Sequence, residues 1–421
     1  TTVRGGDGED TFQVGQIFKS ERDAANANIA PYDEFGTTET TRGYLSNGIS
    51  YATTIEGGSG NDKFTVFRNT AELFLKGGDG DDTFTVRAFA EEGSHTTDLS
   101  GEGGADYVEY VINAPVNVNG GDGSDTLRVI GTEFSDEIVV TSTGVYGMGI
   151  AVSYEEIEIL EIDAAEGNDW FYVLGTCAGV ETRLYGGLGS DRFSIGGDVP
   201  LILSGNDIEL YPATVGPHTL IGIEGVLIIS GAAGDGSAGG LGTPVMLPGE
   251  TNLFSSDSEV RAFSGTGEGG SVDTMGVSTA DLQVVADALG LDDIAALTRR
   301  TLEISQGAGA GRFWLVVGME AGPQEGITTL NLKNPTMPAT EWGLPVPGST
   351  FAITHLSENF FVREEEQVDF TTVYNDESSS DDSGALTATT LTGFGMGAGI
   401  TYEKLEVLDI SLGSGKEALT V

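Results

Sequence analysis

The chain has almost no cysteine, with Cys177 as the only one in 421 residues. Disulfide bonds therefore cannot stabilise the fold, and a zinc site built from several cysteines is excluded. The three histidines, His95, His218 and His355, lack the spacing of metal ligands, and we expect ordinary surface or loop residues. No Asn-x-Ser/Thr sequon with x other than proline occurs, so N-glycosylation has no acceptor.

Basic residues are also scarce, with 19 Lys and Arg against 65 Asp and Glu and a formal net charge of −46. Nucleic acid and anionic membrane surfaces would be repelled, so we expect neither as a partner. No apolar run reaches the length that crosses a bilayer, so we expect no membrane insertion. The negative charge opposes a compact state unless cations neutralise it, which makes divalent cations the expected ligands.

Signatures of catalysis are missing as well. The sequence contains no nucleophile elbow, phosphate loop or zinc motif, and we expect no enzyme. It begins at Thr1, so we expect a processed chain or a piece of a longer one. What it does contain is a hydrophobic fraction of 39%, too high for a disordered acidic tail, and 64 glycines, which predict many tight turns.

One glycine-rich six-residue pattern that ends in aspartate recurs along the first half of the chain. The best copies begin at Gly5, Gly57, Gly77, Gly120 and Gly186. Together with two weaker copies, the final aspartates fall at 10, 62, 82, 106, 125, 169 and 191, which gives gaps of 52, 20, 24, 19, 44 and 22 residues. One motif per ~20–24 residues is the period of a solenoid, in which each repeat packs only on its neighbours.

The residues between two motifs predict short strands. In one unit we expect strands at 63–67 and 72–76, where Phe64 and Val66 alternate with polar neighbours, so that one face is buried. The sequence therefore predicts an all-β fold, a parallel β-solenoid resembling a β-helix, built from coils of ~20–24 residues. Stacking would place every Gly/Asp turn on one edge, anchored by the hydrophobic residue two places after the final aspartate.

Calcium explains such a ladder of carboxylates, because it takes 6–8 oxygen ligands in a flexible cage and because glycine lets a turn adopt positive φ. The alternative is that these are ordinary corners, in which Gly and Asp serve backbone geometry only. The predicted metal ligands are Asp7, Asp10, Asn61, Asp62, Asp79, Asp81, Asp82, Asp106, Asp122, Asp125, Asn168, Asp169 and Asp191.

A longer unit overlays the first. Residues 144–169 and 393–415 both contain a glycine turn, a strand that includes Ser-Tyr-Glu or Thr-Tyr-Glu, a second strand and a glycine-rich corner. They predict β-hairpin excursions from the solenoid. A fainter copy begins at Leu302.

These features resemble the giant extracellular RTX-like, or haemolysin-type, calcium-binding repeat proteins, whose motif is Gly-Gly-x-Gly-x-Asp-x-hydrophobic-x. The resemblance covers residues 1–195 and 385–421 best. It implies an extracellular, calcium-stabilised solenoid. The chain departs from the family because its motifs occur once per coil rather than about every nine residues. Lys416 and Glu417 also stand where Asn-Asp is expected, so that corner has lost its predicted ligand.

Composition divides the chain into three parts. We expect a Gly/Asp-repeat solenoid at 1–230, a Gly-rich linker or loop at 231–250, and a second, divergent β-repeat region at 251–421. Residues 278–289 fit either a helix or a strand followed by a loop.

The expected function is that of a secreted structural protein, such as a filament, surface-layer or matrix segment, that associates end to end. One alternative is the extender region of a large adhesin that contacts polysaccharide or a cell surface. Another is a polysaccharide lyase or epimerase of the β-helix type. Trp170, Trp314 and Trp342 could stack on sugars, although isolated aromatic residues more often serve packing.

Overall fold

The computed structural model describes residues 1–18, 22, 31, 34–40, 43–86, 97–111, 116–131, 135–147, 150–165, 167–187, 189–199, 217–231, 258–265, 272–288, 293–298, 300–306, 308, 313–333, 344–353 and 368–421. The chain forms two compact units. The first comprises Thr1–Thr40, Tyr44–Val245 and Val368–Val421, and the second comprises Thr41–Gly43 and Met246–Gln367.

The first unit is built on two twelve-stranded sheets, here called sheet A and sheet B. Sheet A runs, in spatial order, β1 (Thr2–Asp7), β6 (Thr53–Ser59), β8 (Leu73–Asp79), β10 (Thr97–Gly104), β12 (Val116–Gly123), β16 (Ile150–Glu155), β15 (Gly144–Gly147), β14 (Glu137–Thr141), β18 (Trp170–Val173), β20 (Arg192–Ile195), β28 (Phe370–Tyr374) and β32 (Val407–Ser411). Sheet B runs β2 (Thr11–Val14), β7 (Lys63–Val66), β9 (Thr83–Val86), β11 (Tyr107–Val111), β13 (Thr126–Ile130), β17 (Ile159–Asp163), β19 (Glu181–Tyr185), β21 (Val226–Ser230), β31 (Ile400–Glu403), β30 (Thr390–Gly393), β29 (Ser383–Leu386) and β33 (Ala418–Thr420).

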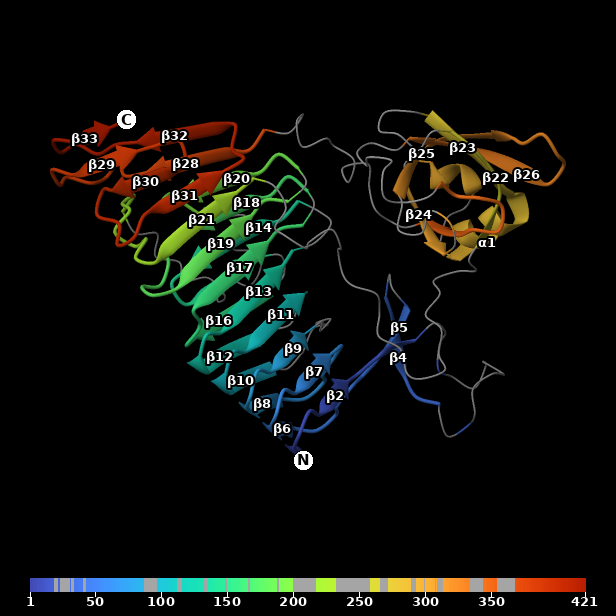
Figure 1. The fold of residues 1–421 in the computed structure, drawn as a ribbon, viewed down its shortest axis with the longest axis horizontal. Helices are drawn as coiled ribbons and strands as arrows, with labels where there is room; N and C mark the ends of the chain where they lie inside the picture. The colour runs from blue at the N-terminus through green and yellow to red at the C-terminus, as the bar shows by residue number, and fades with distance from the viewer. Residues whose placement is uncertain are drawn as a thin grey trace. The chain divides into compact units, whose positions relative to one another are not determined.

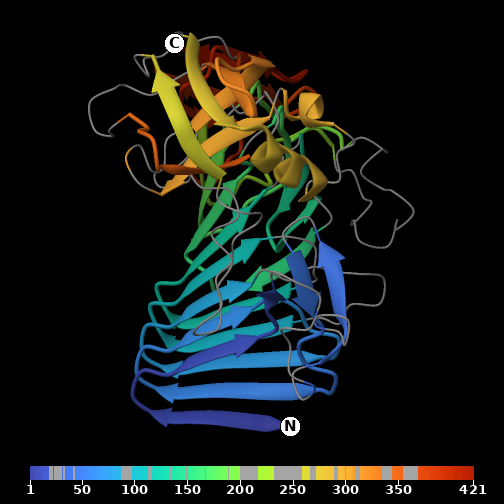
Figure 2. The same ribbon diagram turned by 90° about the vertical axis from the view of Figure 1, so that its right-hand side faces the viewer.

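The chain alternates between these sheets, and successive coils pair in parallel. β6 pairs with β8 so that Ile55 lies beside Leu75, and β7 pairs with β9 so that Phe64 lies beside Phe84. Each coil therefore advances by one strand spacing, about 4.8 Å. The stacked rungs are visible in Figures 1 and 2. The predicted all-β parallel solenoid is confirmed.

The core lies between the two sheets and is made of equivalent side chains stacked coil on coil. Phe12, Phe64 and Phe84 form one stack, with ring centroids 5.1 and 4.7 Å apart. Phe171 and Phe193 form another, at 4.8 Å. All five residues stand two places after a motif aspartate, so the predicted anchoring of each turn is confirmed. Fully burying such a ring contributes about 1.5–3 kcal/mol.

The turns between the sheets lie on two edges. We call the edge where the chain passes from sheet A to sheet B the first edge, and the edge where it returns the second edge. On the first edge the early turns are short and alike: β6 ends at Ser59 and β7 begins at Lys63, and β8 ends at Asp79 and β9 begins at Thr83. The motif aspartates from Asp10 to Asp125 lie in these turns.

The expectation that every Gly/Asp turn lies on one edge is wrong. Strands β14, β15 and β16 form an antiparallel meander within sheet A. A meander of three strands begins and ends like a single strand, so it does not itself change the edge. Asp125 lies in the turn from sheet A to sheet B, whereas Asp169 lies in a turn from sheet B back to sheet A, so the motif moves to the second edge. Asp169 lies between β17 and β18, and Asp191 between β19 and β20.

Both copies of the longer unit form such a meander, which confirms the predicted hairpin excursions. The second copy consists of β29, β30 and β31 in sheet B. Equivalent tyrosines form a hydrogen bond within each meander. The Tyr154 hydroxyl donates to the Thr141 carbonyl (2.9 Å), and the Tyr402 hydroxyl donates to the Thr387 carbonyl (2.6 Å). The backbone repeats as well, because Glu156 and Lys404 both adopt positive φ, 52° and 49°.

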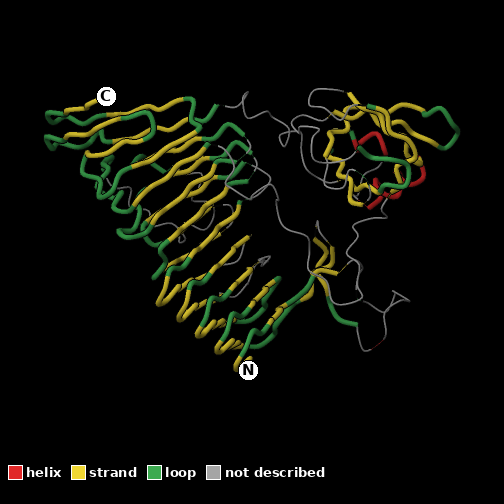
Figure 3. The backbone as a smooth tube through the Cα atoms, viewed as in Figure 1, coloured by secondary structure: helices red, strands yellow, loops and turns green. Residues whose placement is uncertain are grey.

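The second unit is a closed barrel in the order β22 (Ser258–Ser264), β23 (Val272–Ser278), β26 (Ile327–Lys333), β25 (Phe313–Ala321), β24 (Thr301–Gln306) and β27 (Thr350–Ile353). Its own core includes the fully buried Trp314, whose indole N–H donates to Asp273. Helix α1 (Thr279–Ala288), red in Figure 3 with the short 3₁₀ segment Ile294–Leu297, packs Leu282 and Val285 into this core. Of the two options for 278–289, the helix is therefore correct.

Residues 251–421 are thus not one divergent repeat region. The faint repeat copy at Leu302 is strand β24 of the barrel, and the solenoid resumes at β28. Of the proposed linker 231–250, only Gly231 is among the described residues. A small sheet of β3 (Ile17–Phe18), β5 (Gly43–Ser46) and β4 (Thr37–Thr40) completes the structure.

Candidate functional site: the glycine–aspartate corners

The predicted metal ligands separate into three groups by their place in the corner. The last aspartate of each motif points inward; we call these residues the inner aspartates. Those predicted from the sequence are Asp10, Asp62, Asp82, Asp106 and Asp125 on the first edge and Asp169 and Asp191 on the second. The residue just before an inner aspartate occupies what we call the outer position, where Asn61, Asp81 and Asn168 are exposed. Asp7, Asp79 and Asp122 end or nearly end their strands and are also exposed.

The inner aspartates connect successive coils through one carboxylate oxygen. The backbone N–H of Asp10 donates to Oδ1 of Asp62 (2.7 Å), and that of Asp62 to Oδ1 of Asp82 (2.7 Å). The series continues through Asp106 and Asp125 at 2.8 Å and ends on Oε2 of Glu158 at 2.7 Å. Each side chain therefore binds the backbone of the preceding coil.

The same series runs along the second edge and includes two residues that sequence reasoning missed. The N–H of Asp136 donates to Asp169 (2.6 Å), and that of Asp191 to Asp369 (2.8 Å). The sequence carried a weak signal for Asp136, because it follows Ser135 and precedes the buried Ile138 by two places, as in the other motifs. Asp369 lacked that signal because the barrel separates it from its glycine.

The second carboxylate oxygen is buried against glycine. Oδ2 of Asp10, Asp62, Asp82, Asp106, Asp125 and Asp169 is shielded from solvent and has no hydrogen-bond partner among the described residues. A Cβ added to Gly77 would lie 2.0 Å from Oδ2 of Asp82, and one added to Gly57 would lie 2.1 Å from Oδ2 of Asp62. The first glycine of the motif is therefore required by the close approach of the carboxylate.

Burial raises the pKa of Asp82, Asp106, Asp125 and Asp169, and neighbouring carboxylates raise it further. Burial is the main cause that raises the pKa of Asp82 and of Asp106 to about 6 and that of Asp169 to about 10. The N–H donors act in the opposite direction and favour the charged form. At these four inner aspartates the fold therefore favours the neutral form of the carboxyl group.

The outer position forms a second ladder that runs the other way. The N–H of Asp81 donates to Oδ1 of Asn61 (3.0 Å), and that of Ala105 to Oδ1 of Asp81 (2.8 Å). On the second edge the N–H of Ser190 donates to Oδ1 of Asn168 (2.8 Å). Outer side chains thus bind the following coil, and inner side chains bind the preceding one. Each Asn-Asp or Asp-Asp pair therefore connects its own coil to the coils on both sides.

The barrel is inserted within one of these corners. A Cβ on Gly231 would lie 2.1 Å from Oδ2 of Asp369, just as one on Gly186 would lie 2.2 Å from Oδ2 of Asp191. The Phe370 N–H donates to the Asp191 carbonyl (2.8 Å), which continues the coil. The two ends of the inserted segment therefore meet as an ordinary Gly/Asp corner.

The inner aspartates do not fit a calcium cage. One oxygen accepts a backbone N–H, and the other lies against a glycine Cα, where an ion and its other ligands have no room. Within the described residues, no group of three or more His, Cys, Asp or Glu side chains is placed to hold a metal ion. The exposed carboxylates of Asp7, Asp79, Asp81 and Asp122 stay accessible to cations.

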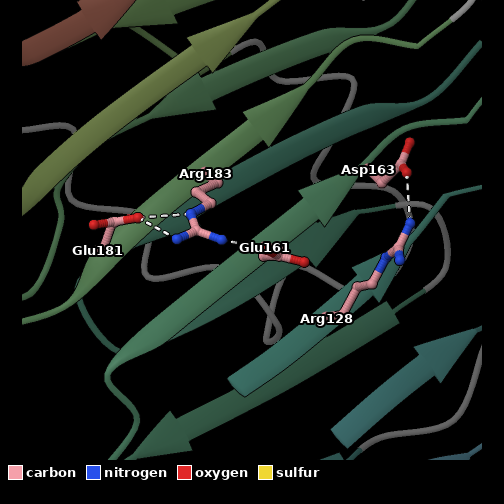
Figure 4. A network of polar contacts seen from close by, with 5 residues as sticks. All are labelled: Arg128, Glu161, Asp163, Glu181 and Arg183. Carbon is pink, nitrogen blue, oxygen red and sulfur yellow. Dashed lines mark hydrogen bonds and ion pairs between the residues drawn. The ribbon is translucent and has the colours of Figure 1, made fainter. Parts of the chain in front are cut away.

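Several of the few basic side chains also connect coils. Figure 4 shows Arg128 of β13, which contacts Asp163 of β17 at 3.0 Å, and Arg183 of β19, which contacts Glu161 of β17 at 2.7 Å. Asp163 is fully buried and the Arg128 side chain is 16% exposed, so this pair is screened little by solvent. The cations thus stabilise the stack in its middle coils.

His218 is a connecting residue that its sequence position did not reveal. Its Nε2 lies 3.2 Å from Oδ1 of Asp198, and its Nδ1 lies 3.1 Å from Oδ1 of Asp376. The hydrogen bond to Asp198 is the main cause that raises the pKa of His218, and Asp376 adds to it. Protonated His218 joins two first-edge connections, one after β20 and one after β28.

A shallow groove of about 360 Å³ lies along the second edge, across β18, β20 and β28. The guanidinium of Arg192 lies 4.6 Å from the ring centroid of Trp170, which is 36% exposed. In the described part of the chain no carboxylate forms an ion pair with Arg192. The lining residues are Asn168, Trp170, Ser190, Arg192, Val368 and Phe370.

No known protein family, curated protein or solved structure matches this chain. Among the described residues, no helix has the length and apolar character needed to span a membrane. The resemblance to RTX-like proteins stays a prediction from the motif.

Proposed function

We propose that this chain is an extracellular structural module, in which a stiff β-solenoid carries an inserted barrel. The observation that supports this most directly is the pair of opposed ladders at the corners, because every bond in them joins one coil to the next. Such bonds resist bending and separation of coils and contribute no reactive group. The closed Gly231–Asp369 corner fits the same role, since the solenoid continues unbroken past the barrel.

Location can be tested on intact cells of the source organism. Protease added outside the cells should release peptides of this chain, and lysis should not be required. Recovery of its peptides only after lysis would contradict an extracellular role.

The proposed function includes calcium, which would bind near the exposed carboxylates. With a net charge of −46, cations near Asp79, Asp81 and Asp122 would reduce repulsion between coils. Ligands that bind only the folded state raise its stability by mass action. A thermal melt in calcium should therefore lie above one in excess chelator, and equal melting temperatures would remove calcium from the proposal. Magnesium at equal ionic strength is the control for simple screening.

The proposed function also includes end-to-end association of the solenoid. Within the described residues, β1 and β32 are the outermost strands of sheet A, and exposed strand edges can pair with another chain. Val3, aligned with the buried Ile55, is 42% exposed. Sedimentation should show assembly that increases with protein concentration, and V3K should weaken it. V272K, at an exposed barrel position, is the matched control.

The groove at Trp170 favours the adhesin alternative among the other roles considered. Its exposed indole, guanidinium, amide and hydroxyl groups are suited to bind a sugar polymer. Oligosaccharide titration followed by calorimetry tests this, and W170A should weaken the binding if the groove is the site. A lyase or epimerase would in addition show turnover on pectin or alginate.

A further inference from the structure

We infer that the inner aspartates act as coil-to-coil clamps rather than as calcium ligands, so that the Gly-Gly-x-Gly-x-Asp corner specifies stacking without a metal. Every fixed position of the motif has a role in this clamp. The inference deepens the structural role proposed above, and it stands whether or not the exposed carboxylates bind calcium.

Both carboxylate oxygens of an inner aspartate are already occupied or enclosed. At Asp82, Oδ1 accepts the N–H of the buried Asp62. Its Oδ2 is shielded from solvent and lies against Gly77. A calcium ligand of the RTX type would need at least one oxygen directed at a shared ion, and neither oxygen of Asp82 is available for this.

The glycines of the motif allow the coils to stack closely. Gly78 and Gly80 adopt φ of 117° and 131°, and a Cβ on either would lie 2.0 or 2.5 Å from a carbonyl oxygen of the preceding coil. Gly77 makes room for the Asp82 carboxylate. At this corner, positive φ at Gly78 and Gly80 and close stacking at all three positions therefore favour glycine in the absence of any ion.

The clamp is also present at corners where the calcium motif is incomplete. Around Asp106 the motif is degenerate, with Glu102 in place of the second glycine and Ala105 in the outer position. Even so, Asp106 accepts the N–H of Asp82 at 2.8 Å. The barrel corner retains only Gly231 and Asp369 and closes in the same way. What persists is the aspartate and its glycine, which are the parts the clamp needs.

The test compares two substitutions of Asp82. D82N keeps Oδ1 as an acceptor, whereas D82A removes it and leaves the buried N–H of Asp62 without a partner. We expect the Asp62 amide to exchange with solvent at close to the native rate in D82N and about tenfold faster or more in D82A. The calcium-induced shift in melting temperature should be unchanged in D82N.

D79N is the matched control, because it removes the same charge from an exposed position of the same corner. If calcium stabilises the chain, D79N should reduce that effect more than D82N does. The inference is overturned if D82N exchanges as fast as D82A, or if D82N abolishes a calcium response that D79N preserves. Should D82A fail to fold, the exchange rate and calcium response of D82N still decide the question.

Discussion

Gly231 and Asp369 form one corner of the solenoid although the whole barrel lies between them in the sequence. A Cβ on Gly231 would lie 2.1 Å from Oδ2 of Asp369, and Oδ1 of Asp369 accepts the N–H of Asp191 at 2.8 Å. These are the contacts of an uninterrupted motif. The solenoid therefore supplies the geometry of this corner, and the inserted residues do not.

Excision of the barrel is accordingly expected to leave the solenoid folded. Residues 232–368 would be replaced by Gly-Leu-Gly-Ser, the sequence of the 187–190 turn, so that Gly231 again stands five places before the aspartate. Circular dichroism should show a β-rich protein with one cooperative melt. A control that joins the ends through two residues instead of four should be less stable, because it cannot span the corner. Failure of both variants would show that the solenoid depends on the barrel.

Glycine at the first motif position is expected to be irreplaceable. Gly77→Ala should lower the free energy of unfolding by about 1–3 kcal/mol or more, because the added Cβ would overlap the Asp82 carboxylate. Gly103→Ala is the matched control, because its Cβ would meet its nearest neighbour at 3.9 Å. That control should stay within about 0.5 kcal/mol of the native protein. Chemical denaturation measures both, and equal losses would contradict the assigned role of Gly77.

The solenoid should be more stable in mild acid than in base when cations are absent. The fold raises the pKa of Asp82 and Asp106 to about 6 from a value of 3.8. Their neutral forms are therefore favoured by folding, and this contribution is lost as the pH rises through about 6. Melts in chelator should show a lower melting temperature at pH 8 than at pH 5, with a difference in unfolding free energy of about 1 kcal/mol or more.

D82N should reduce this dependence on pH, because its amide cannot ionise. D79N removes an equal charge from the surface and should reduce it less. An unchanged pH profile in D82N would mean that general repulsion, rather than the buried carboxylates, sets the acid stability.

His218 should titrate above the usual range for histidine. Hydrogen bonds to Asp198 and Asp376 raise its pKa from 6.5, so its contribution to stability is complete below that value and is lost as the pH rises through the folded pKa. NMR titration of the imidazole should place the midpoint above 6.5, and Asp198→Asn should lower it. His218→Gln should destabilise the protein at pH 6 and have little effect at pH 9. A midpoint at or below 6.5 would contradict the contacts of His218 with Asp198 and Asp376.

Much of the fold could be predicted from the sequence because the signals are local. A hydrophobic residue two places after each aspartate, as at Phe64 and Phe84, predicted both the strands and the buried face. The repeat period predicted the coil. The two long units predicted the meanders, since the same turn residues recur around Tyr154 and Tyr402.

The roles of individual site residues could not be predicted in the same way. Asp79 and Asp82 carry the same carboxylate, and the sequence does not show which of the two is buried. The structure places the first in solvent and the second against Gly77. His218 acquires its partners only because two distant connections lie side by side.

The sequence by itself thus determined the solenoid, its period and its inward face, because these depend on the order of side chains along one strand and one turn. Only the tertiary structure decided which edge carries each corner, that Gly231 meets Asp369 across the barrel, and that the inner aspartates join coils. Those properties depend on contacts between coils about 4.8 Å apart in space but some twenty or more residues apart in sequence. The physical reason is that each carboxylate accepts a hydrogen bond from a backbone N–H of the adjacent coil. Which N–H this is depends on how the coils stack, and not on the local sequence.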